Sequence, residues 1–162
     1  RLEISLSASD AAFAGAVDAA VLYREHASKA GIDITVLREP ADGYWSDVWM
    51  KKPFSAVFWR GRPTEDWFFS TVYAPGAPWN DTFWDHPRFN EVLAAARVEL
   101  DESRRAAMYA ELQQLVRDEG GAIIPMFANY VSASSSKVRH HEQVAASDDL
   151  DGMRLTERWW FD

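Results

Sequence analysis

Two short stretches of alternating apolar and polar residues open the chain, and a helical pattern lies between them. Residues 2–6 alternate with one apolar face, and residues 32–36 repeat the pattern, which is typical of strands with one buried side. Between them apolar residues recur at helical spacing; Ser9 or Asp10 can cap this helix, and Gly31 can end it. This order predicts a βαβ unit with two parallel strands joined by a right-handed crossover.

The longest regular pattern, in residues 80–127, predicts two helices followed by an extended segment. The first helix begins at Pro87, and Asp101 can cap the second by accepting from the free amides of its first turn. The apolar faces consist of Phe89, Val92, Leu93 and Ala96 in the first helix and Met108, Leu112, Leu115 and Val116 in the second. Gly120 and Gly121 predict a left-handed stop, and the Ile-Ile-Pro run after them predicts a strand. The pattern indicates an amphipathic helical hairpin.

The remaining stretches carry weaker patterns. Residues 44–50 predict a short helix, and residues 54–59 predict a third strand that is apolar on both faces and therefore buried. Residues 61–80 are irregular and rich in Trp, Phe, Pro and Gly, and a long irregular loop in a compact domain is usually functional. Beyond Phe127 the chain begins as a strand, becomes a polar Ser-rich connection and ends in Trp-Trp-Phe at residues 159–161. The whole pattern predicts an α/β fold with a mixed sheet.

Composition and charge narrow the function. The 162 residues are 48% apolar and 14% aromatic, enough for one domain with a real core. The net charge of -8 disfavours nucleic acid and anionic lipid as partners, because both require a basic face. The chain has no Cys, which fits an exported bacterial protein, and charges interrupt every apolar run before it reaches the length of a membrane span. Its opening, Arg-Leu-Glu-Ile-Ser, does not resemble a signal peptide.

The order of residue types around the hairpin resembles the C-terminal part of the peptide/nickel type (family 5) solute-binding proteins of ABC transporters. Members commonly show an Asn, a Trp or Tyr, a Phe before a Leu-bearing helix, an Asp-x-x-x-Arg helix with a Tyr, and an Ile-Pro strand. The matching positions are Asn80, Trp84, Phe89, Asp101, Arg105, Tyr109, Ile124 and Pro125. The resemblance covers most of the chain.

The resemblance implies that this chain is the C-terminal fragment of a periplasmic protein several hundred residues long. Residues 1–124 are then the C-terminal ligand-binding lobe of a two-lobed fold, and residues 125–162 return toward the N-terminal lobe. The two lobes close over a solute by a hinge, and the closed form docks on the permease while a separate subunit hydrolyses ATP. An oligopeptide is the expected solute, although the family also includes members for sugars, nickel chelates and opines. With half of its ligand site missing, the fragment alone should bind solute weakly.

The candidate ligand site begins where the predicted third strand ends, at the carboxyl edge where open α/β sheets tend to bind ligands. In the resembling family a Trp here is followed by Gly or Ala and then by an Asp, which in peptide binders pairs with the free amino group of the ligand. This chain reads Trp59-Arg60-Gly61-Arg62, so Arg62 takes the acidic position. Arginine suits a carboxylate and cannot hold an ammonium, which leaves Asp66 or Asp81 to supply the negative charge.

Aromatic residues are dense in the following loop, and rings stack on varied ligands. The expected ligand-binding set is Trp59, Gly61, Arg62, Asp66, Trp79, Asn80 and Trp84. The alternative for each ring is that it packs the loop onto the helices, and Asn80 serves equally well as a cap or turn residue.

Metal, cofactor and catalytic chemistry are not expected. His140 and His141 are adjacent and point to opposite faces of an extended chain, so they are poorly placed to hold one ion. No nucleophile motif, Gly-rich phosphate loop or paired acid and base stands out, which disfavours an enzyme. The alternative function is a stand-alone interaction module that uses the Trp-rich loop and the Trp-Trp-Phe tail to bind a partner protein.

Overall fold

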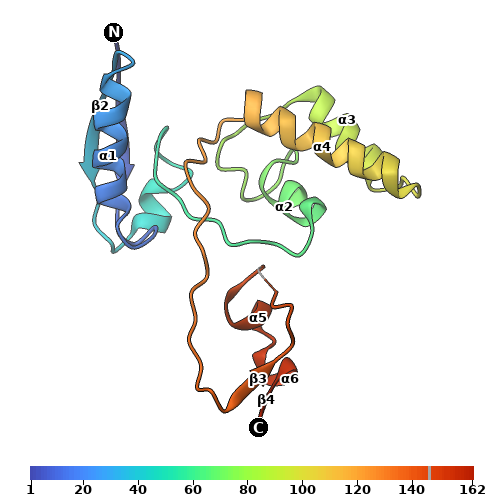
Figure 1. The fold of residues 1–162 in the computed structure, drawn as a ribbon. Helices are drawn as coiled ribbons and strands as arrows, with labels where there is room; N and C mark the ends of the chain where they lie inside the picture. The colour runs from blue at the N-terminus through green and yellow to red at the C-terminus, as the bar shows by residue number, and fades with distance from the viewer. Residues whose placement is uncertain (146) are drawn as a thin grey trace. The chain divides into compact units, whose positions relative to one another are not determined.

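The computed structural model describes residues 1–145 and 147–162, in two compact units. The first unit is Arg1–Trp59 and the second is Arg60–Asp162 (Figure 1). Among the described residues, no helix combines the length and apolar character needed to cross a bilayer.

The first unit contains the predicted βαβ arrangement. Strands β1 (Leu2–Ala8) and β2 (Ile32–Arg38) are parallel and pair in register along their full length, and helix α1 (Ala16–Ser28) connects them. The helix begins later than expected: its N-cap is Gly15, which has a φ of 80°, instead of Ser9 or Asp10. Gly31 has a φ of +78°, so it makes the left-handed turn that the sequence predicts at the end of the helix.

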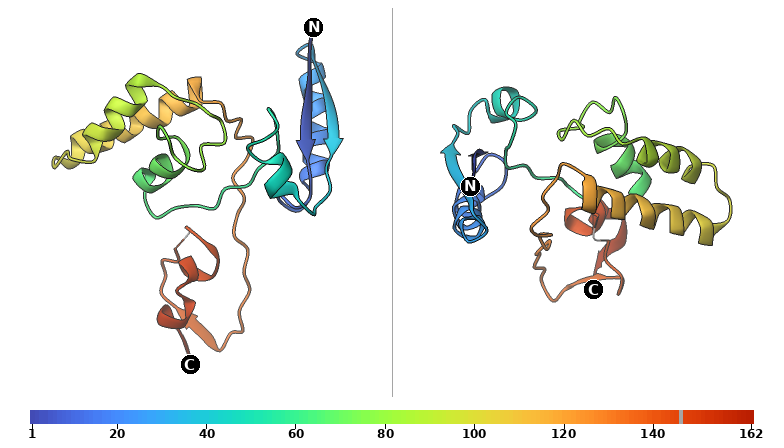
Figure 2. Two further views of the ribbon diagram at one scale, coloured as in Figure 1. Left: turned by 180° about the vertical axis from the view of Figure 1, so that it is seen from behind. Right: turned by 90° about the horizontal axis from the view of Figure 1, so that it is seen from above.

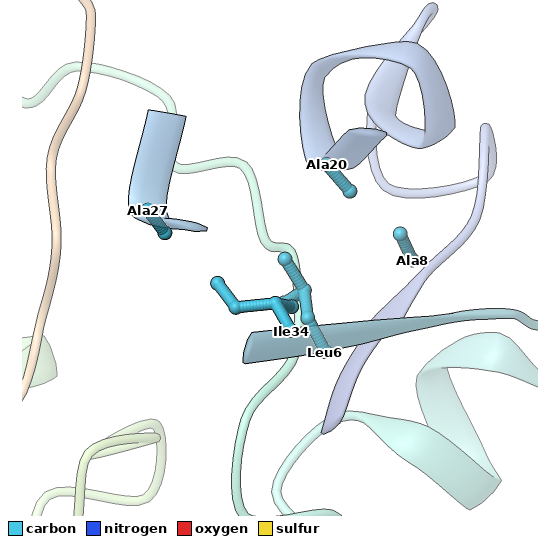
Figure 3. Packing of buried hydrophobic residues seen from close by; sticks show 5 residues of the cluster. All are labelled: Leu6, Ala8, Ala20, Ala27 and Ile34. Carbon is cyan, nitrogen blue, oxygen red and sulfur yellow. The ribbon is translucent and has the colours of Figure 1, made fainter. Parts of the chain in front are cut away.

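The core between α1 and the two strands combines two larger aliphatic side chains with small alanine side chains. Leu6 and Ile34 rise from the strands toward the alanines of the helix, as Figure 3 shows. The buried members of this cluster are Leu6, Ala8, Ala20, Ala27 and Ile34. Alanine lets a helix lie close to a sheet, because it presents only a methyl group at the contact.

The predicted third strand at residues 54–59 is wrong. The segment forms a single parallel bridge, from Ser7 to Ser55, in which the Ser7 amide donates to the Phe54 carbonyl at 3.0 Å. The carbonyl of Ala56, two residues after Phe54, accepts a hydrogen bond of 2.6 Å from the Tyr44 hydroxyl and does not extend the pairing with β1. Tyr44 is buried in a π-helical turn, η1 (Tyr44–Val48), where the sequence predicts a short helix.

The second unit is mainly helical. Helix α2 (Glu65–Val72) lies within the stretch predicted to be irregular, and the Thr64 side chain caps it by accepting from the Trp67 amide at 3.2 Å. Helices α3 (Pro87–Ala96) and α4 (Glu102–Glu119) lie side by side and form the predicted hairpin (Figure 2). Asp101 caps α4 as expected, accepting from the Arg104 amide at 2.9 Å.

The segment after α4 differs from the prediction. Gly120 has a φ of −66°, so the left-handed stop is wrong; glycine is needed because a Cβ there would collide with the Val116 carbonyl oxygen. Residues 122–135 are extended, and none of them belongs to a strand among the described residues. Ile123 is 59% exposed, because no neighbouring strand covers it.

The C-terminal segment forms its own small hairpin. Strand β3 (Val138–His140) pairs antiparallel with β4 (Trp159–Phe161), and two short turns, α5 (Asp149–Met153) and α6 (Leu155–Arg158), lie between them. The α/β class and the parallel βαβ unit are confirmed, although the described strands make two separate sheets, one parallel and one antiparallel. The boundary expected between residues 124 and 125 stays a prediction.

Candidate functional site

The second unit contains a pocket with a volume of about 580 Å³. This volume falls within the range typical of small-solute sites. The lining comes from the chain before α2, one face of α2, the loop after it and the C-terminal segment. These residues are Gly61, Arg62, Pro63, Trp67, Ser70, Thr71, Pro78, Trp79, Ser147, Asp148 and Gly152.

The pocket brings together three of the expected ligand-binding residues, Gly61, Arg62 and Trp79. Gly61 is needed for close approach, since a Cβ there would lie 2.9 Å from the Ser147 carbonyl oxygen. Trp79 is 44% exposed, so its ring is accessible to a ligand. The three come from the segment just before α2 and from the loop that follows it.

Arg62 is the cationic side chain of the pocket lining. Its Nη1 donates to the carbonyl oxygens of Arg60 and Gly61, each at 3.1 Å, and its guanidinium carbon lies 5.8 Å from the centroid of the Trp67 ring. These contacts hold the guanidinium beside the aromatic wall by a cation–π interaction. No carboxylate among the described residues lies within ion-pair distance of Arg62.

Asp148 is the acidic side chain of the pocket lining. Its Oδ1 lies 3.2 Å from Nη1 of Arg60 and also accepts from the Asp149 amide at 2.9 Å. The carboxylate is therefore engaged within the protein by one cation and one backbone amide.

Asp66, expected to replace the missing acidic ligand contact, is not among the pocket-lining residues. Its Oδ1 accepts from the Tyr109 hydroxyl at 3.2 Å and lies 3.0 Å from Nε of Arg97. Burial, followed by the charge of Asp66, raises the pKa of the Tyr109 hydroxyl. This network links α2 to α4 and to the C-cap residue of α3, Arg97, and a ligand contact of Asp66 stays a prediction.

Asn80 and Trp84 also lie outside the pocket lining. Asn80 is buried; its Nδ2 donates to the Trp84 carbonyl at 2.8 Å, and its Oδ1 accepts from the Thr82 hydroxyl at 3.0 Å. The Trp84 ring packs against Phe89 with ring centroids 5.0 Å apart. Asn80 thus has hydrogen-bond partners within the turn and Trp84 has a packing partner, and a ligand contact of either residue stays a prediction.

Trp59 is the last residue of the first unit. Its ring meets that of Trp49 edge to face, with centroids 6.2 Å apart. A ligand contact of Trp59 stays a prediction.

Four polar lining residues were not predicted from the sequence: Ser70, Thr71, Ser147 and Asp148. Ser70 Oγ is buried and has no hydrogen-bond partner among the described residues. The missed signal is Thr64 followed by two acidic residues, which is typical of a helix start. A helix beginning there places Trp67, Ser70 and Thr71 on one face, at i, i+3 and i+4.

The two adjacent histidines contact different tryptophans. The ring of His140 lies 4.8 Å from that of Trp159, and the ring of His141 lies 5.3 Å from that of Trp160. Within the described part of the chain, no group of three or more His, Asp or Glu side chains is arranged to hold a metal ion.

Solved structures share the fold of this chain. It superposes on NikZ from Campylobacter jejuni, solved in complex with Ni(L-His), with a TM-score of 0.63 and 18% identity. HbpA2 from Haemophilus parasuis gives 0.61 and 15%, and DppA from Helicobacter pylori, an ABC transporter-associated periplasmic binding protein in complex with the peptide STSA, gives 0.57 and 17%.

Each match covers 74% of this chain, and the share of the other protein is 25% for NikZ and HbpA2 and 24% for DppA. The chain thus spans about a quarter of the length of these proteins. No protein-family model matches the sequence, and a comparison with curated protein sequences finds no significant match. At these identities the likeness concerns the fold: the chain has the fold of part of a periplasmic binding protein.

Proposed function

We propose that this chain is the C-terminal part of a periplasmic solute-binding protein that delivers a peptide or peptide-like solute to an ABC importer. The observation that carries the proposal is the fold likeness, which extends over 74% of the chain and includes one binding protein solved with a peptide. The pocket of about 580 Å³ supports it, because two tryptophans and one arginine line a volume suited to a small solute.

In this role the chain performs no chemistry. A second lobe closes over the solute, the closed form docks on the permease, and a separate subunit supplies the energy by hydrolysing ATP. Binding energy comes from rings that cover the apolar parts of the solute and from polar groups that fix its ends. The residues expected to contribute are Arg62, Trp67 and Trp79, which share the pocket lining.

The test is native mass spectrometry of the protein at its natural length, purified from its host, followed by identification of whatever co-purifies. A bound short peptide or a mixture of peptides is the expected result. A bound solute of another chemical class would keep the transport role and contradict the peptide. A reproducible complex with another protein and without any solute would contradict solute capture.

A second candidate function rests on the exposed C-terminal tail. Phe161 is 83% exposed, and exposed apolar surfaces often mark protein contacts. A protein-interaction module would use this tail together with the Trp-rich loop. Replacing Trp160 and Phe161 by Ser distinguishes the two functions: a module loses its protein partner, whereas a solute-binding protein retains its solute.

A further inference from the structure

We propose that the pocket selects solutes that carry a carboxylate and lack a free ammonium group, with Arg62 as the residue that determines this preference. The inference rests on the proposed function and names the solute class for the same site. It follows from the balance of engaged and unengaged charges in the pocket lining.

Arg62 can bind an anionic group through its positive charge and its remaining N–H donors. Its Nη1 is occupied by two backbone carbonyls, and those neutral acceptors do not cancel the positive charge. Nε and Nη2 have no hydrogen-bond partner among the described residues. A planar guanidinium can present these two nitrogens to both oxygens of one carboxylate, which an ammonium of lysine cannot do.

The acidic group of the lining is not available to a cationic ligand. The Asp148 carboxylate is 3.2 Å from Arg60 and caps the turn that follows it, so a solute ammonium would have to displace an existing ion pair. Two acids, Glu65 and Asp66, follow Arg62 closely in the sequence, and neither lines the pocket. Asp66 is engaged by Arg97 and Tyr109. The charged side chains of the lining are Arg62 and Asp148. Because Asp148 is paired with Arg60, which lies outside the lining, the positive charge of Arg62 has no matching carboxylate there.

The aromatic walls suit an apolar body next to that carboxylate. Trp67 and Trp79 are 53% and 44% exposed, and both rings line the pocket. The guanidinium carbon of Arg62 lies 5.8 Å from the centroid of the Trp67 ring, so a solute carboxylate bound to Arg62 places the rest of the solute next to this ring. Ser70 on the same helix face has a buried hydroxyl without a hydrogen-bond partner among the described residues.

The net charge of the chain does not reverse this local preference. A charge of -8 repels anions at a distance, but at physiological ionic strength fields between exposed charges are largely screened beyond about 8 Å. The contact with Arg62 acts well inside that distance. Affinity for an anion is therefore decided within the pocket.

Three peptides of the same length separate the charge classes. They are N-acetyl-alanyl-alanyl-phenylalanine, which is anionic; its C-terminal amide, which is neutral; and alanyl-alanyl-phenylalaninamide, which is cationic. Calorimetric titration of the protein at its natural length is expected to give roughly 10- to 100-fold tighter binding of the anionic peptide than of the other two, as a charge-assisted hydrogen-bonded pair provides.

Two variants assign the preference to Arg62. Arg62→Gln should remove it and leave the affinity for the neutral peptide within about threefold, because the aromatic walls remain. Arg104→Gln is the matched control, since Arg104 is exposed on α4 and does not line the pocket. It should preserve the full preference.

Three other outcomes would each contradict part of the proposal. Equal binding of the three peptides, or tightest binding of the cationic one, overturns the carboxylate preference and leaves peptide capture standing. An anionic preference that survives Arg62→Gln overturns the role of this residue. Binding of none of the three contradicts peptide capture itself, which the co-purified solute decides independently.

Discussion

Asp66 connects three helices through its carboxylate, which accepts from Tyr109 and pairs with Arg97. We therefore predict that Asp66→Asn lowers the free energy of unfolding by about 1 kcal/mol, since both partners are partly exposed and their contacts are screened by water. Solute affinity should change less than in Arg62→Gln, because Asp66 is not among the pocket-lining residues.

Urea unfolding followed by tryptophan fluorescence measures the first effect and calorimetry the second. Glu142→Gln provides the control, because Glu142 is an exposed acid in the same unit. A loss of solute binding in Asp66→Asn without a loss of stability would indicate that Asp66 contacts the solute.

Asp151 gives the C-terminal hairpin a dependence on pH. The amide of Ala145, followed by the indole of Trp159 and the charge of Arg158, lowers the pKa of its carboxyl group below the ordinary value. A lowered folded-state pKa contributes stability at neutral pH, and this contribution is lost as the pH falls through the ordinary carboxyl range toward the folded-state value. The hairpin is therefore expected to loosen in acid.

Asp151→Asn isolates this effect. Asp151 has a φ of 60°, a conformation that Asn tolerates well, so the substitution removes the charge without straining the backbone. The tryptophan fluorescence of the chain, to which Trp159 contributes, followed from pH 7 down to about pH 2 should show an acid transition in the parent chain that is reduced in the variant. Identical profiles in the two chains would contradict this role of the carboxylate.

Helix α4 depends on its first turn, where the Asp101 carboxylate accepts from the Arg104 amide. We predict that Asp101→Ala lowers the free energy of unfolding by about 1 kcal/mol, because the amide loses its acceptor and the negative charge no longer favours the helix start. Asp101→Asn keeps the acceptor and should cost less. Chemical denaturation checks both, and equal losses in the two variants would show that the charge, and not the cap, supplies the stability.

Elements with local signals were predictable, whereas elements that need a distant partner were not. The βαβ unit and the helical hairpin follow from periodicity and from the cap at Asp101, both of which lie within a few residues. The strands expected at residues 54–59 and at Ile123 are apolar runs that have few or no backbone partners here. Periodicity reports that a segment can be buried, and it does not report whether a neighbouring strand exists.

The pocket was predictable in part for the same reason. Arg62 was expected because it takes the position where the resembling family has an Asp, and Trp79 was expected because aromatic residues are dense in its loop. Ser147 and Asp148 line the same pocket although they follow Arg62 by more than eighty positions in the sequence. No local sequence pattern predicts that these residues lie together. Asn80 matches the motif of the resembling family and its side chain bonds within the turn, so its contact with ligand stays a prediction.

At the scale of the whole molecule, the proposed function predicts that these 162 residues alone bind solute poorly. The chain spans about a quarter of the length of the proteins that share its fold, so most of a two-lobed cleft would lie outside it. Titration of the isolated chain with the anionic peptide should give a dissociation constant weaker than micromolar, and the protein at its natural length should bind more tightly. Sub-micromolar binding by the isolated chain would contradict the division of the site between two lobes.

The extended stretch at residues 122–135 also makes the chain a substrate for proteases. Proteases bind their targets as extended, accessible backbone, and Phe127 is 88% exposed within this stretch, which suits an enzyme that cleaves after aromatic residues. Brief treatment with chymotrypsin should cut here before it cuts the helices, and the two products would then carry opposite sides of the pocket lining. Co-elution of the products would mean that contacts such as the Arg60 and Asp148 pair hold the pocket together without a peptide bond between its halves.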